Sequence, residues 1–61
     1  MEQKYRVCRI GANYNWYLRP DELFTVTVEN AAAFSKKECD AIVKEFNEQS
    51  SKHIYISDPI N

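Results

Sequence analysis

The sequence predicts an α+β fold of order β-β-β-α-β, in which one amphipathic helix packs on one face of a small, mostly antiparallel sheet. Residues 35–49 combine the start signal and the apolar spacing of such a helix. Short stretches of β-forming residues, separated by turn residues, surround it. With 61 residues and no repeat or linker, the chain has room for one domain, 1–61.

The first two strands are expected to form a hairpin. Residues 5–10 are rich in β-forming side chains and end at Gly11, the only glycine in the chain. Gly11 and Asn13 both tolerate a positive φ, so residues 11–13 suit a turn. Residues 14–18 then read as the second strand, with its aromatic side chains alternating between the two faces.

A third strand is expected over residues 23–28. Pro20 and Asp21 suit the positions of a preceding turn, because proline presets φ at the first central position. Bulky apolar residues then alternate with threonines, which predicts a strand with one buried face. The side chains expected to point inward are Phe24, Val26 and Val28.

The helix over residues 35–49 has the clearest sequence signals. Ser35 and Glu38 have the spacing of a capping box, in which each side chain bonds the backbone amide of the other. Phe34 and Cys39 occupy the two positions of a hydrophobic staple. The apolar residues then recur with helical spacing on one face, which is expected to pack on the sheet. This face consists of Cys39, Ile42, Val43 and Phe46.

Residues 53–57 predict a fourth strand that ends at Asp58 and Pro59. Strand three, the helix and strand four form a crossover, for which a right-handed path is expected. This path makes the fourth strand parallel to the first and gives a sheet order of third, second, first, fourth. One sheet face then lies uncovered, and a bare face or free edge is a candidate interface.

A domain of this size usually needs a disulfide, a metal or a partner chain to stabilise it. The chain opens on Met1 and polar residues with no apolar signal segment, so a cytoplasmic location and reduced thiols are expected. Cys8 and Cys39 are interpreted as small buried hydrophobes. One histidine and two isolated cysteines predict no metal site and no cofactor. A homodimer is therefore expected.

No arrangement of residues in the sequence indicates catalysis. His53 is a possible base and either cysteine a possible nucleophile, but nothing in their spacing brings them together. No glycine-rich phosphate loop is present, and no apolar run approaches the roughly 20 residues needed to span a bilayer. The sequence thus predicts a non-enzyme with no small-molecule substrate and no membrane segment.

Charge and aromatic residues are concentrated at the start of the chain. Residues 1–20 hold four basic residues against one acidic residue, whereas residues 21–61 hold four lysines against eight acids. Tyrosine, tryptophan and arginine are enriched at protein interfaces, which favours a protein-binding module. Basic strands with aromatics also suit single-stranded nucleic acid, and this alternative stays open. The candidate interface residues are Tyr5, Arg6, Arg9, Tyr14, Trp16, Tyr17 and Arg19.

Two stretches resemble small, mostly uncharacterised phage and prophage proteins. Lys4-Tyr5-Arg6-Val7 is similar to the "K-Y-x-V" strand that opens their β-hairpin. Residues 31–42 resemble the "A-x-F-[ST]-K-x-E-A" helix start that follows it, with Cys39 in place of the usual alanine. The resemblance covers residues 4–48. It implies a phage accessory protein that inhibits a bacterial host or antiviral-defence protein by binding it, and it transfers no functional residues.

Overall fold

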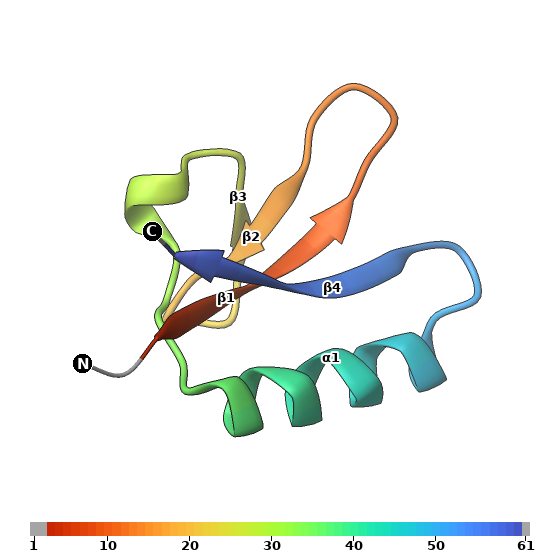
Figure 1. The fold of residues 1–61 in the computed structure, drawn as a ribbon. Helices are drawn as coiled ribbons and strands as arrows, with labels where there is room; N and C mark the ends of the chain where they lie inside the picture. Colours follow the sequence, from red (N-terminus) through yellow and green to blue (C-terminus); the bar gives the residue numbers. More distant parts are fainter. Residues whose placement is uncertain (1–2, 61) are drawn as a thin grey trace.

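The structure, a computed structural model, describes residues 3–60. Four strands, a short 3-10 helix and one α-helix follow one another along the chain (Figure 1). Their bounds are β1 Lys4–Ile10, β2 Trp16–Leu18, β3 Phe24–Thr25, η1 Val28–Asn30, α1 Lys36–Gln49 and β4 Ile54–Ile60.

The strands form one sheet in the order β3-β2-β1-β4, as the sequence predicted. Helix α1 lies along one face of β1 and β4, which confirms the α+β class and the position of the helix (Figure 1). All three strand pairs are antiparallel. The fourth strand pairs with β1 over the full length of both strands, from Ile10 opposite Ile54 to Lys4 opposite Ile60.

The expected parallel pairing of the fourth strand with the first is therefore wrong, and so is the crossover that implied it. The cause is an additional reversal of the chain in residues 26–34. Phe34 forms an isolated bridge with Tyr5, and the Ala32 amide donates to the carbonyl of Leu18 at 2.9 Å. The chain thus returns to the N-terminal end of β1 before α1 begins. The helix then runs toward the C-terminal end of β1, and β4 returns antiparallel to β1.

The third strand is shorter than the sequence predicts. It ends at Thr25, and Val26 and Val28 are 47% and 38% exposed instead of pointing inward. The Thr27 amide donates to the hydroxyl oxygen of Thr25 at 3.1 Å. Such local side-chain bonds compete with a strand ladder, and here the chain turns into η1 directly afterwards.

Helix α1 matches the prediction. Ser35 is the N-cap, the Glu38 amide donates to its hydroxyl oxygen at 3.2 Å, and both halves of the capping box are formed. The predicted apolar face packs against β1 and β4, with Cys39 fully buried. The buried core in residues 3–60 is small and consists of Val7, Cys8, Leu18, Cys39 and Tyr55.

The fourth strand extends beyond its predicted end, because Asp58 and Pro59 continue it to Ile60. Proline is tolerated here because β4 is an edge strand. Within the part of the chain that the structure describes, no helix has the length and apolar character needed to span a bilayer.

Candidate functional site: an acidic-rimmed apolar groove

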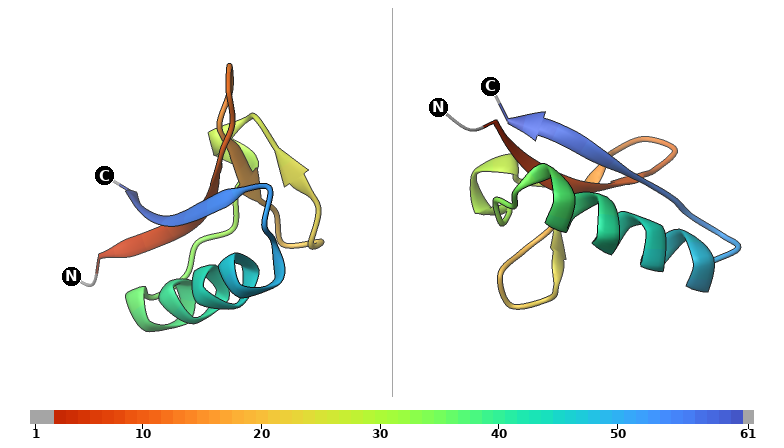
Figure 2. Two further views of the ribbon diagram at one scale, coloured as in Figure 1. Left: turned by 90° about the vertical axis from the view of Figure 1, so that its right-hand side faces the viewer. Right: turned by 60° about the horizontal axis from the view of Figure 1, so that its bottom comes forward.

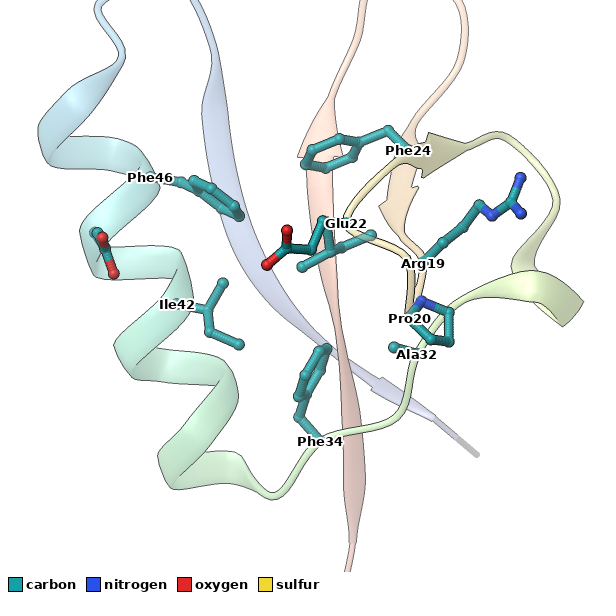
Figure 3. Close-up of a pocket in the computed structure, with 10 residues that line it drawn as sticks. Arg19, Pro20, Glu22, Phe24, Ala32, Phe34, Ile42 and Phe46 are labelled. Atoms are coloured by element: carbon teal, nitrogen blue, oxygen red, sulfur yellow. The ribbon is translucent and has the colours of Figure 1, made fainter.

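The sheet twists so strongly that β2 and β3 turn away from the helix (Figure 2). Helix α1 packs on β1 and β4 and leaves the β2–β3 side of the same face open. A groove of about 670 Å³ lies there, between α1 and the turn that joins β2 to β3 (Figure 3). We call it the helix–turn groove. It is lined by Leu18, Arg19, Pro20, Glu22, Phe24, Ala32, Phe34, Ile42, Glu45 and Phe46.

One wall of the helix–turn groove is an aromatic cluster. The rings of Phe24 and Phe46 lie 6.0 Å apart, and both pack against Tyr55, at 6.1 and 5.1 Å. These distances are in the range of favourable tilted aromatic pairs. The guanidinium of Arg9 lies 4.8 Å from the centre of the Phe24 ring. This wall of the groove is therefore aromatic and well packed.

Two carboxylates lie at the rim of the groove. Glu22 projects from the β2–β3 turn into the space between the sheet and the helix, and Glu45 lies on α1 (Figure 3). Among the described residues, neither has a salt-bridge partner. Arg19 lines the groove too, but its guanidinium pairs with Asp21 at 2.8 Å. The unbalanced charge at the rim is thus negative.

The turn that presents Glu22 has a strained backbone. Glu22 has a φ of 69°, in the left-handed region that favours glycine. The loop is closed by a bond from the Arg19 amide to the Leu23 carbonyl at 2.7 Å and by one from the Leu23 amide to Asp21 at 3.1 Å. This geometry holds the Glu22 side chain at the rim of the groove.

A second surface lies on the sheet face opposite α1, which we call the open face. There the Arg6 guanidinium pairs with Asp58 of β4 at 2.7 Å and lies over the ring of Tyr17 of β2, 5.2 Å from its centre. Arg6 thereby links three strands across this face. Cys8 is on the same face and is only 2% exposed, because it lies between these side chains and Ile56.

From these contacts of Arg6 toward the Ile10 end of β1, the open face is apolar. Ile10 and Ile54 are directly opposite on β1 and β4, and Ile56 is opposite Cys8. Paired residues of adjacent strands share a face, so all three isoleucines project from the open face. They are 39%, 67% and 42% exposed. We call Ile10, Ile54 and Ile56 the isoleucine patch.

The structure does not gather the predicted interface residues on one surface. Arg6 and Tyr17 are on the open face, whereas Arg9 lies on the helix side over the ring of Trp16, 5.3 Å from its centre. Tyr5 packs against the core, and Tyr14 is 67% exposed in the β1–β2 loop.

Of the predicted set only Arg19 lines the helix–turn groove. From the sequence, the remaining groove residues are interpreted as core, as turn, as the lead into the helix or, for Glu45, as the solvent-exposed face of the helix. The spacing of these residues in the sequence does not indicate that a groove lies between the helix and the turn.

Thiol chemistry finds little support in the geometry. Both cysteines are free and buried, as the sequence predicted. Burial raises the pKa of the Cys8 thiol and of the Cys39 thiol, which disfavours the reactive thiolate. His53 is exposed, with its ring edge toward Tyr55 at 6.4 Å. Across residues 3–60 no group of three or more His, Cys, Asp or Glu side chains is arranged to hold a metal.

The fold and the groove together define a small α+β domain with an apolar groove at one side of its helix. No family model matches the chain, and comparisons with curated proteins and with solved structures give no match.

Proposed function

We propose that this protein is a non-enzymatic protein-binding module whose helix–turn groove takes an apolar segment of a partner protein. The observation that carries the proposal is the combination of a groove of about 670 Å³ with aromatic walls and an acidic rim. Protein-binding sites commonly combine an apolar pocket, which takes an anchor side chain of the partner, with a few polar groups at its edge.

The rim defines the chemistry of the segment. Because Glu22 and Glu45 have no cationic partner in residues 3–60, a lysine or arginine beside the apolar anchor satisfies them. Such rim charges act chiefly on the association rate and on partner choice, and salt screens them. The partner segment is therefore an apolar side chain flanked by basic residues.

The kind of partner follows from the resemblance of residues 4–48 to phage and prophage accessory proteins. On that resemblance, the proposed partner is a bacterial host or antiviral-defence protein, and binding inhibits it. This places the proposed site of action in the bacterial cytoplasm.

The experiment compares capture of partners by the wild type, the double variant Glu22→Lys/Glu45→Lys and the control Glu48→Lys. Glu48 is exposed on α1 and does not line the groove, so the control changes the same helix without touching the site. Tagged proteins are incubated with bacterial lysate, with and without nuclease treatment, and the captured proteins are quantified by mass spectrometry. We expect one protein that the wild type and the control retain and the rim variant loses.

The candidate partner is then purified and titrated. We expect the rim variant to weaken binding at least tenfold, and high salt to weaken wild-type binding mainly by slowing association. Capture that is the same for all three proteins would contradict the proposal. Capture that disappears with nuclease treatment would replace it with the nucleic-acid alternative.

A further inference from the structure

The β4 edge of the sheet is partly blocked against strand pairing. Strand β4 is an edge strand, and the Tyr55 amide donates to Asn47 Oδ1 at 2.8 Å while Asn47 Nδ2 donates to the Tyr55 carbonyl at 3.0 Å. Both outward backbone groups of Tyr55 are thus occupied by a side chain of α1. Pro59, four residues on, has no amide to offer. An added strand is thus blocked at Tyr55 and loses one bond at Pro59.

The isoleucine patch has no such protection. It lies on two adjacent strands, and within residues 3–60 no α-helix covers it, since α1 is on the other face (Figures 1 and 2). Ile54, which is two-thirds exposed, lies opposite Ile10, so the two side chains form a continuous apolar surface. Exposed contiguous apolar surface on a small protein is typical of an interaction site.

The charges nearest the patch are balanced, and Lys4 of the same face lies at the far end of β1, opposite Ile60. Arg6 and Asp58 lie on the open face and neutralise each other at 2.7 Å. A twofold interface brings the same surface of both chains together, and it therefore needs a surface that does not repel itself. The open face meets that condition, whereas two copies of the acidic groove rim repel each other.

We propose that the open face binds a second copy of this chain, with the isoleucine patch at the centre of a twofold interface. The small size of the core favours a second copy over another occupant. In residues 3–60 only Val7, Cys8, Leu18, Cys39 and Tyr55 are buried. A protein with so small a core is stabilised by a partner, and a second copy is present wherever the chain itself is made. At a twofold axis, the three isoleucines of each chain would bury apolar surface of both chains.

Sedimentation equilibrium of the wild type, Ile54→Lys and the control Leu23→Lys tests the proposal. Leu23 is 60% exposed, similar to Ile54, but lies in the β2–β3 turn away from the patch. From low to several hundred micromolar, we expect the wild type and the control to rise from 7.2 kDa toward twice that mass. The Ile54→Lys variant is expected to stay at 7.2 kDa with an unchanged circular dichroism spectrum.

A wild-type dilution series followed by amide NMR keeps the proposal testable if the variant does not fold. We expect concentration-dependent shifts at Ile10, Ile54 and Ile56. A wild type that remains monomeric throughout, or a control that loses association as fully as Ile54→Lys, would overturn the proposal. Shifts confined to Ile42 and Glu45 would also overturn the proposal, because they would place self-association at the groove. The result of the capture experiment with the rim variant does not bear on this proposal, because that variant changes only the groove.

Discussion

Among residues 3–60, Glu22 is the one non-glycine residue whose backbone lies in the left-handed region. Its side chain lies at the rim of the groove. An L-residue in that conformation costs about 1–2 kcal/mol relative to an ordinary one. Glycine is the residue that avoids this cost. Strain of this kind is retained where the surroundings hold it, and it occurs often at binding sites. The strain at Glu22 is therefore compatible with the binding role proposed for this residue.

Replacing Glu22 with glycine tests this interpretation. We expect Glu22→Gly to raise the free energy of unfolding by about 1 kcal/mol, because the strain is relieved. The matched control Glu48→Gly, within α1, is expected to lower it by about 1 kcal/mol. Urea unfolding measures both. If the groove proposal holds, Glu22→Gly also weakens partner binding. A variant less stable than the wild type would show that the turn is not strained.

At the scale of secondary structure, α1 and β4 are joined by polar contacts as well as by the core. Asn47 bonds both backbone groups of Tyr55, and Asp40 accepts from the Ser57 hydroxyl at 2.6 Å. Asn47 and Asp40 are seven residues apart, so both lie on the side of the helix that faces β4. The helix thereby fixes the position of the edge strand and shields part of its edge.

The substitution Asn47→Ala is expected to lower the free energy of unfolding by about 1–3 kcal/mol, since two backbone groups of Tyr55 lose their partners. It also opens the β4 edge, so we expect faster aggregation on heating. Thermal scans with light scattering measure both effects. Glu48→Ala is the control, because this residue is exposed on the same helix. Equal behaviour of the two variants would contradict the shielding role.

The start of α1 depends on its capping box. Ser35→Ala removes the acceptor of the Glu38 amide, and we expect the free energy of unfolding to fall by about 1 kcal/mol. Ser51→Ala, at an exposed position beyond the helix, serves as the control and is expected to change little. Urea unfolding compares the two. A cost for Ser51→Ala as large as that for Ser35→Ala would show that the cap is not the cause.

For the whole molecule, the directions of four pKa shifts predict that stability depends on pH at both ends of the range. Hydrogen bonds from Ser35 lower the pKa of Glu38, and bonds from Lys36 and Ser57 lower that of Asp40, from ordinary values of 4.5 and 3.8. Their contribution is present above those values and is lost as the pH falls. Burial raises the pKa of Cys8 and Cys39 above 9.0, so their contribution is present below pH 9.0 and is lost as the pH rises through the folded-state values.

We therefore expect the free energy of unfolding to be highest between about pH 5 and pH 9 and to fall on both sides. Urea titrations across this range measure it. The double variant Cys8→Ala/Cys39→Ala is expected to be less stable at pH 7 but to lose less stability between pH 8 and pH 10. An unchanged alkaline slope in this variant would mean that the thiols do not titrate with unfolding. Lys36 remains as a second alkaline group, since its bond to Asp40 raises its pKa from 10.5.

The sequence by itself determined the helix and the first hairpin; the strand order was also predicted correctly, but from a parallel crossover that the structure does not contain. Ser35, Glu38 and the apolar face of α1 act within a few residues of one another, so their pattern is readable without the rest of the fold. The burial of Cys8 and Cys39 was predictable from residue type, because a reduced cysteine behaves as a small hydrophobe.

Only the tertiary structure decided the direction of β4, the early end of β3 and the helix–turn groove. The direction of β4 depends on the return of residues 26–34, which is fixed by bonds from Ala32 to Leu18, 14 residues away, and between Phe34 and Tyr5, 29 residues away. No local pattern in that segment specifies those partners. The groove likewise exists because a twisted sheet carries β2 and β3 away from a straight helix. This separation arises only when the sheet and the helix pack together, so the sequence of neither element predicts it.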